Sequence, residues 1–458
     1  MPQYVLQQWE PDDPAFWKQR GARIARRNLW ISIPALMLAF CVWLLWSVVV
    51  VNLNRAGFSL TKDQMFWLTA LPALSGATLR IFYSFLVPIV GGRRWTALST
   101  ASLLVPAIGM GIALRDPSTS YGTLLALALL CGLGGGNFSS SMANISFFFP
   151  KEQKGLATGL NAGIGNLGVS LVQFTVPLAI STGLFGPLGG APQDVAGHAP
   201  LWLQNAGLIW VIPIAVTSLA AWFGMNDIAS ARASFTEQAV IFRRKHNWVM
   251  CWLYVGTFGS FIGFSAGFAI LSQTLFPQAD PTAYAFLGPL VGSLTRPLGG
   301  WVSDRVGGAR VTFWTFAAMI AAVVGVLAFL PPAGETGGNF GGFLGMFIVL
   351  FALTGVGNGS TFRMIPVIFL QQQLIAAGQQ AQAQQQARSE AATESAAVLG
   401  FSSAIGAYGG FFIPRSFGSS LALTGGAQAS LYGFIIFYAS CLLATWWWYA
   451  RRNAPVPC

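Results

Sequence analysis

Two arginines stand where a charge is costly, inside apolar stretches long enough to cross a membrane. Arg80 lies within Met65–Val90, and Arg296 lies within Tyr284–Val302. Each is followed eleven residues later by a Gly-Gly-x-Arg turn. A fixed cation in such a segment indicates a functional site. Because the pattern occurs twice at the same spacing, it predicts a duplicated unit whose two halves share one site.

The chemistry that these arginines offer is recognition of a small anion. None of the 14 Asp and Glu residues lies well inside an apolar stretch, and Asp304, for example, falls at the end of one. The alternative role, pairing with buried acids or carbonyls, is therefore disfavoured, and the two guanidiniums need an anion from outside. A guanidinium presents paired, planar N–H donors that suit a planar oxyanion.

Further candidate contacts for the anion are aromatic and amide side chains near the same stretches. Phe138 follows a glycine run, and Tyr254 and Phe258 lie one helical turn apart. A flat ring can face a flat anion, and a tyrosine hydroxyl can donate a hydrogen bond to it. Asn166, an amide among glycines, is another candidate donor. Most other aromatic residues are expected to serve packing or the membrane interface.

Glycines form the other conspicuous pattern. Gly155, Gly159 and Gly163 recur every four residues and so share one helical face. This face has two interpretations of equal weight. One is close packing of a neighbouring helix, and the other is open backbone beside a cavity, which leaves room for a small ligand and for helices to slide. Gly163 and Gly165 belong to the run Ala162–Gly168, which resembles a later run, Ser403–Gly409, that contains Gly406 and Gly409. The run Gly132–Gly136 does not indicate a dinucleotide site, because no strand precedes it.

Composition shows what must position these residues. The 458 residues are 54% hydrophobic and 9% charged, and the mean hydropathy is +0.60. Soluble domains carry about 25% charged residues, so the chain is an all-α polytopic membrane protein. We expect twelve spans: Leu29–Val51, Met65–Val90, Trp95–Leu114, Tyr121–Phe148, Gly155–Ile180, Leu201–Phe223, Trp248–Phe276, Tyr284–Val302, Val311–Leu330, Phe340–Leu370, Ser395–Pro414 and Ala427–Tyr449.

These spans predict two pseudo-symmetric six-helix halves. Glycine runs occur at corresponding places in spans four and ten and in spans five and eleven. The expected parts are an amino-terminal segment (1–28), a first half (29–224), a linker (225–247), a second half (248–450) and a tail (451–458). The Gln- and Ala-rich connection Gln371–Thr393 is expected to be a mobile cytoplasmic loop without a site.

The distribution of charge sets the orientation. The net charge is +11, and of the 25 Lys and Arg only Arg55, Lys62, Arg115 and Arg415 fall on one side of the expected topology outside the spans. This asymmetry places both termini in the cytoplasm and removes the need for a nucleic-acid partner. Four of the five cysteines lie in apolar spans, and His198 and His246 are far apart, so we expect no metal, cofactor or disulfide framework.

At this point the sequence resembles a known family. Gly299–Arg310 is similar to the cytoplasmic loop motif of the major facilitator superfamily, and Gly159–Ser170 and Gly400–Pro414 resemble the paired signatures of its nitrate/nitrite porters. The resemblance is closest to NarK-type exchangers and covers nearly the whole chain. It implies the major facilitator fold, anion binding by Arg80 and Arg296, and contacts from Tyr254, Asn166 and Phe138.

One position departs from the family pattern. The first-half loop has Pro88 where Asp304 would align, so this loop lacks the acid of its counterpart. In the second half, Asp304 is expected to latch one conformational state through contacts with Arg305 and Arg310 at the helix ends. Arg363, at the inner end of span ten, has no assigned role.

The expected function is exchange of nitrate and nitrite across the bacterial inner membrane by alternating access, nitrate entering and nitrite leaving. Its partners would be these anions and membrane lipid, and we expect a monomer. An empty site with two nearby positive charges should close poorly. Proton-coupled nitrate symport and an anion channel remain alternatives. An enzyme is disfavoured, since no buried acid, His pair or activated nucleophile is evident.

Overall fold

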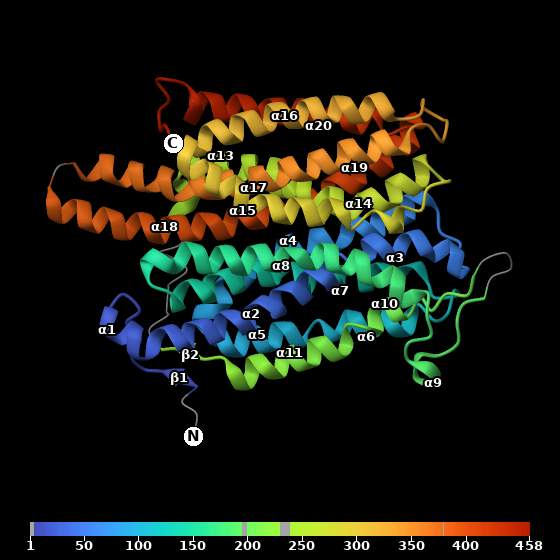
Figure 1. Ribbon diagram of the computed structural model, residues 1–458, viewed down its shortest axis with the longest axis horizontal. Coiled ribbons are helices and arrows are strands. Elements are labelled where there is room, and N and C mark those ends of the chain that lie inside the picture. The colour runs from blue at the N-terminus through green and yellow to red at the C-terminus, as the bar shows by residue number, and fades with distance from the viewer. Residues whose placement is uncertain (1–3, 195–198, 230–238, 379) are drawn as a thin grey trace. The chain divides into compact units, whose positions relative to one another are not determined.

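The computed structural model describes residues 4–194, 199–229, 239–378 and 380–458, and most of these residues are helical (Figure 1). The part 230–238 of the expected linker and His198 lie outside the described residues. The first elements are β1 (Val5–Leu6), α1 (Pro14–Phe16), α2 (Ala22–Trp43), α3 (Trp46–Leu53), α4 (Lys62–Val90), α5 (Gly92–Ala101), α6 (Leu104–Ala113), α7 (Tyr121–Phe148), α8 (Lys151–Ile180), α9 (Gly186–Gly189), α10 (Asn205–Leu208), α11 (Val211–Gly224) and β2 (Asp227–Ile228). Then follow α13 (Lys245–Tyr254), α14 (Ser260–Leu275), α15 (Leu287–Val306), α16 (Gly308–Phe329), α17 (Phe340–Ala377), α18 (Ala381–Ala407), α19 (Gly409–Thr424) and α20 (Gln428–Thr445).

The predicted spans are found in order. In the described residues, 11 helices, some built from consecutive elements, are long and apolar enough to cross a membrane. The remaining predicted span is α15, which carries Arg296, Asp304 and Arg305 and is therefore too polar to meet the same criterion. The all-α polytopic fold expected from the sequence is confirmed.

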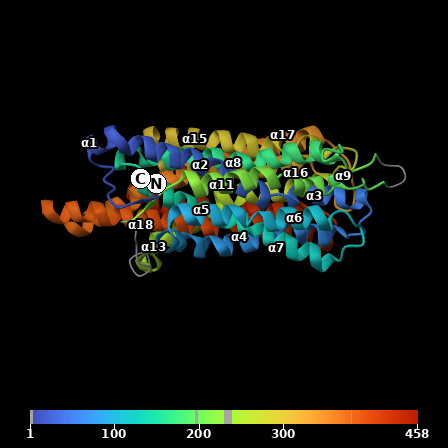
Figure 2. The ribbon, with the colours of Figure 1, turned by 90° about the horizontal axis from the view of Figure 1, so that it is seen from below.

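The chain divides into two compact units. Unit 1 comprises Met1–Arg232, Ser265–Leu290 and Phe411–Gly418, and unit 2 comprises Ala233–Phe264, Val291–Gly410 and Ser419–Cys458. Within each unit the long helices run side by side (Figures 1 and 2).

The Gln-rich connection is helical, contrary to the expected mobile loop. Helix α17 continues to Ala377 and α18 begins at Ala381, so the two helices form a projecting pair at the left of Figure 1. Gln and Ala are both good helix formers, and this propensity holds the helices without an apolar stripe. Glu394 of α18 also pairs with Arg244 at 2.6 Å.

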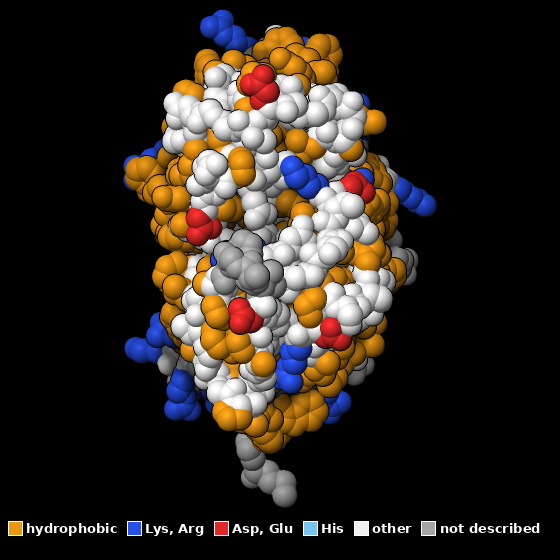
Figure 3. Space-filling view, turned by 90° about the vertical axis from the view of Figure 1, so that its right-hand side faces the viewer, with side chains coloured by type: hydrophobic (Ala, Val, Ile, Leu, Met, Phe, Trp, Pro, Cys, Tyr) orange, Lys and Arg blue, Asp and Glu red, His pale blue; other side chains and the backbone are white. Residues whose placement is uncertain are grey.

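Burial differs sharply among the spans. In the most apolar part of the first span (α2 and α3) 89% of residues are buried, and in that of the seventh (α13 and α14) 94%. Other helices expose large apolar side chains such as Ile112, Ile212 and Ile436. The helix end seen in Figure 3 carries polar and charged side chains, with hydrophobic side chains gathered toward its margins. This is the pattern expected of helices surrounded by lipid.

Glycines determine how closely the helices that carry the arginines approach their neighbours. In unit 1, a Cβ added to Gly135 of α7 would lie 2.7 Å from the Cα of Gly76 in α4, and one on Gly134 would lie 2.1 Å from the Ala39 carbonyl oxygen. In unit 2, a Cβ on Gly355 would lie 2.1 Å from the Gly292 carbonyl oxygen. Such distances are possible only without side chains.

These contacts predict opposite effects for two glycine-to-alanine changes. Gly134→Ala places a methyl group against backbone and should lower the free energy of unfolding by about 1–3 kcal/mol. Gly159→Ala, where nothing lies within 4 Å, should be neutral or raise it by about 0.5–1 kcal/mol, because alanine favours the helix. Thermal unfolding of the purified protein in detergent measures both. Equal stability of the two variants would contradict the close approach of α2 and α7.

Candidate anion-binding site

Arg80 of α4 is fully buried in unit 1, where a backbone carbonyl and aromatic rings orient its guanidinium. Its Nε donates to the Gly135 carbonyl oxygen at 2.9 Å, which the absence of a side chain on α7 makes reachable. The guanidinium carbon lies 5.0 Å from the Trp43 ring centroid and 4.9 Å from that of Phe138. Aromatic faces attract a cation electrostatically without neutralising it. The predicted pair of Arg80 and Phe138 is therefore in contact.

Arg296 of α15 occupies a comparable environment in unit 2. Its Nη2 donates to the Tyr254 hydroxyl at 3.3 Å, and its guanidinium carbon lies 5.2 Å from the Phe362 ring centroid. The side chain is 7% exposed, its Nη1 has no hydrogen-bond partner, and no described carboxylate pairs with it. Part of the donor set of Arg296 is thus available to a ligand.

Tyr254 is held by an irregular piece of helix. It ends α13, and a π-helical turn, Val255–Gly259, leads to α14. The rings of Tyr254 and Phe258 stack at 5.3 Å with an angle of 16° between their planes. A Cβ on Gly406 would meet Tyr254 at 2.8 Å, and one on Gly409 would meet the Gly259 Cα at 2.3 Å. Gly406 and Gly409 therefore pack directly on the segment that presents the tyrosine.

The other signature residues lie on α8 in unit 1. Asn166 is 1% exposed, and its Oδ1 has no hydrogen-bond partner among the described residues. A Cβ on Gly165 would meet Leu36 at 2.7 Å, whereas nothing lies within 4 Å of Gly163. Gly155 and Gly159 are equally open. Helix α8 therefore packs closely on its neighbour at Gly165. The face that carries Gly155, Gly159 and Gly163 has open backbone within the described residues, so close packing of a helix does not account for it.

The charged end of α15 has a partner that the sequence left unassigned. Asp304 forms an ion pair with Arg363 of α17, and both side chains are about half exposed. Arg305 instead lies over the Trp301 ring at 3.7 Å, and Arg310 is exposed in the first turn of α16. Arg363 is thus the residue that contacts Asp304 in this structure, in place of the expected Arg305 and Arg310.

Comparisons with known proteins place this arrangement in a family. Residues 31–385 match the Major Facilitator Superfamily. The chain is 52% identical to the nitrate/nitrite transporter NarU of Escherichia coli over 98% of this chain and 97% of that protein. It is 41% identical to the probable nitrate/nitrite antiporter NarK2 of Thermus thermophilus, again over 98% and 97%.

The chain belongs to the nitrate/nitrite porter family of the major facilitator superfamily. A crystal structure of a bacterial homologue of the human lysosomal transporter Spinster, in an inward-facing and occupied conformation, has the same fold. Its TM-score is 0.58 and its sequence identity 13%, over 93% of this porter and 96% of that chain. The relatives are transporters by name, and this porter is accordingly not an enzyme.

Two aromatic contacts of the porter's arginines are absent from the sequence-based set. Trp43 belongs to the first span, and its Nε1 donates to the Pro72 carbonyl oxygen at 2.8 Å, which fixes the ring beside Arg80. Phe362 is one helical turn beyond Gly359, the residue that aligns with Phe138 in the repeat. Because a glycine aligns with Phe138, the repeat predicts no aromatic ring at that position of the second half. Phe362, one helical turn further along, is the signal that could have been found.

Among the described residues, neither a metal site nor the cavity lined by Arg55 and Asp280 coincides with these side chains. Among the described His, Cys, Asp and Glu, no three gather as metal ligands. A cavity of about 360 Å³ in unit 1 is lined by Arg55 and Asp280 among others and contains none of the candidate residues. Because these two charges are opposite, the cavity is a poor anion site.

The aromatic contact of Arg80 predicts a measurable stability difference. Phe138→Leu keeps most of the buried volume and removes the ring face, and the desolvated cation–π interaction should cost about 1–2 kcal/mol beyond repacking. Phe66→Leu is the control, because Phe66 is equally buried and no cation–π contact is described for it. Denaturant or thermal unfolding should show the larger loss for Phe138→Leu. Equal losses would mean that the ring only fills space.

Proposed function

We propose that this porter exchanges nitrate for nitrite across the bacterial inner membrane, holding the anion between Arg80 and Arg296. The observation that carries the proposal is the unmatched charge of Arg296, which is 7% exposed and has a donor atom without a partner. A buried ion without a counter-charge costs several kcal/mol, so a bound monovalent anion stabilises this site. The paired N–H donors of guanidinium fit the planar oxygens of nitrate and nitrite.

The neighbours of the two arginines support a planar ligand. Phe138 and Phe362 lie against Arg80 and Arg296 at 4.9 Å and 5.2 Å. Rings at the faces of the guanidiniums leave the donor edges directed away from the rings, where a flat anion can accept in the same plane. Tyr254 adds a hydroxyl donor, and Asn166 adds an amide whose Nδ2 can donate.

Exchange follows from the same electrostatics. With no anion, two positive groups would face each other across the closing halves, so the empty carrier should return slowly. Nitrate brings one negative charge into the site and nitrite can replace it on the way back. The Thermus relative is named a probable nitrate/nitrite antiporter, which agrees with exchange.

Polar contacts at one end of the helices support alternating access. Within unit 1, Gln173 donates to the Ser265 carbonyl oxygen at 2.8 Å, and Ser170 donates to that of Phe286 at 2.9 Å. Arg415 pairs with Asp63 at 2.7 Å. These contacts join the first sequence half to segments of the second, and we propose that they break and form again in each cycle. Hydrogen bonds and ion pairs of this kind can break and re-form without unfolding a helix, which suits a reversible closure.

The orientation proposed for the porter follows its charge asymmetry. Both termini are placed in the cytoplasm because most Lys and Arg outside the spans lie on that side of the topology. The working unit is proposed to be a monomer surrounded by lipid, because one chain supplies both arginines.

Counterflow in proteoliposomes tests exchange. Vesicles loaded with nitrite or nitrate should accumulate labelled external nitrate, and empty vesicles should take up little, because the unoccupied carrier returns slowly. Vesicles loaded with chloride are the control for the internal anion.

Two results would contradict exchange. Uptake driven by a proton gradient into vesicles without an internal anion would indicate symport. Unitary currents in a planar bilayer would indicate a channel.

Conservative replacement of the arginines tests the site. Arg80→Lys or Arg296→Lys keeps the charge and loses the paired donors, so nitrate affinity should fall about 10–100-fold, equivalent to a loss of about 1.5–3 kcal/mol. Arg388→Lys, at an exposed position on α18, is the matched control and should bind as the unaltered protein does. Isothermal titration with nitrate measures all three. Unchanged affinity in both buried variants would rule out the paired-donor site.

A further inference from the structure

The loop after α4 receives an acid from a distant part of the chain. This loop, Gly91–Arg94, has Pro88 where the second half has Asp304. In the structure the Asp227 carboxylate binds this loop through Arg93. Its Oδ1 accepts a hydrogen bond from the Arg93 backbone N–H at 2.8 Å, and its Oδ2 accepts one from Arg93 Nε at 3.3 Å. The acid that seemed missing from the first half is supplied by the segment that follows α11.

The backbone at Gly91 is shaped for this contact. Gly91 has φ +97°, a backbone angle that residues with a side chain rarely adopt. A Cβ at this position would lie 2.6 Å from the Asp227 Oδ1. Its counterpart Gly307 has φ +98°. At the position equivalent to Arg93, the Ala309 N–H donates to the Cys458 carbonyl oxygen at 3.1 Å. In both halves, therefore, an oxygen from the segment after the last helix binds the same backbone N–H.

Arg93 is enclosed by further contacts. Its Nη1 donates to the Trp222 carbonyl oxygen at 2.7 Å, and its guanidinium carbon lies 4.5 Å from the Tyr4 ring centroid and 5.1 Å from that of Trp222. The side chains of Arg93 and Asp227 are only 7% and 10% exposed. The ion pair thus joins the start of α5 to the end of α11 in a largely dry environment.

The segment around Asp227 is tied to the other helices of unit 1. Its neighbour Asn226 donates its backbone N–H to Asn28 Oδ1 of α2 at 2.9 Å and accepts from Arg27 Nη2 at 2.7 Å. The Asp227 N–H donates to the Tyr4 carbonyl oxygen at 2.8 Å within the parallel pair β1–β2. Asp227 is therefore a junction of α2, α5, α11 and the amino-terminal strand.

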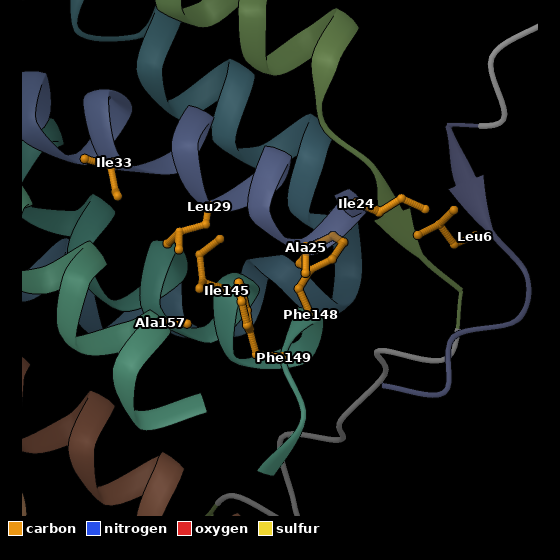
Figure 4. Packing of buried hydrophobic residues seen from close by; sticks show 9 residues of the cluster. All are labelled: Leu6, Ile24, Ala25, Leu29, Ile33, Ile145, Phe148, Phe149 and Ala157. Atoms are coloured by element: carbon orange, nitrogen blue, oxygen red, sulfur yellow. The ribbon is translucent and has the colours of Figure 1, made fainter. Parts of the chain in front are cut away.

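The amino-terminal strand is anchored in the core of the same unit. Figure 4 shows the Leu6 side chain on β1 beside the β2 strand and directed toward Ile24 of α2. Leu6 is 3% exposed, and Trp9 donates its Nε1 to the Phe147 carbonyl oxygen at 3.0 Å. The strand therefore remains attached to unit 1 independently of the Arg93–Asp227 pair.

We propose that Asp227 is a positioning residue for transport, which makes α2, α4, α5 and α11 move as one body with the amino-terminal strand. The proposal rests on the exchange function above. Helix α4 carries Arg80 and ends at the loop that Asp227 holds. Arg80 itself is oriented by Gly135, Trp43 and Phe138 further inside unit 1. Loss of Asp227 therefore frees the end of the helix and leaves the binding geometry in place.

The test separates rate from affinity. Asp227→Ala should lower the rate of nitrate/nitrite counterflow in proteoliposomes about tenfold, because conformational steps set the rates of such cycles. Nitrate affinity by titration should stay within about twofold, since the ground-state contacts of the anion are unchanged. Asp227→Glu, which keeps the carboxylate, should recover most of the rate. Glu335→Ala is the control, because Glu335 is exposed and no side-chain contact is described for it, so it should change neither quantity.

Folding and function are separated by two further measurements. The Asp227 variants are compared by thermal unfolding, and a doubly altered chain, Arg93→Asp with Asp227→Arg, restores opposite charges. Recovery of rate in the exchanged pair, above that of Asp227→Ala, supports the proposal. An unchanged rate in Asp227→Ala overturns it, and so does a parallel loss of affinity and rate. Absence of exchange by the unaltered protein would instead overturn the proposed function.

Discussion

The structure depends on holding a guanidinium in the apolar interior of a helix bundle against backbone carbonyls and aromatic rings. Arg80 is fully buried, with a backbone carbonyl at 2.9 Å and aromatic rings near 5 Å from its guanidinium carbon. Carbonyl dipoles and ring faces offer partial negative charge, so they orient a cation and leave most of its field in place.

This constraint explains why the helices facing the arginines are rich in glycine. Arg80 reaches the Gly135 carbonyl because α4 and α7 touch where Gly76 and Gly135 lack side chains. In unit 2, a Cβ on Gly359 would lie 2.2 Å from the Arg296 carbonyl oxygen. Where the chain must bring backbone to a buried cation, any larger residue would separate the helices. The glycine runs are thus part of the arginine sites.

The fold class and the two buried arginines, Arg80 and Arg296, could be picked out because the cost of burying charge in a membrane does not depend on tertiary detail. Residues that act through tertiary contacts could not be predicted from the sequence. Phe362 is displaced by one turn from the position that the repeat suggests, and Asp227 reaches Arg93 only through the path of the chain after α11. The Gln-rich stretch looked like a loop because it has no apolar periodicity, although its composition favours helix.

The two halves hold their equivalent loops with ion pairs of different strength, which suits different duties. Arg363 and Asp304 are 46% and 55% exposed, so their pair is worth about 0–1 kcal/mol and can separate and re-form readily. Arg93 and Asp227 are 7% and 10% exposed, and breaking a buried pair by removing one partner costs about 3–5 kcal/mol. A contact of the first kind can separate at little cost, whereas one of the second kind is costly to break. The repeated fold therefore combines a largely buried ion pair in one half with a half-exposed ion pair in the other.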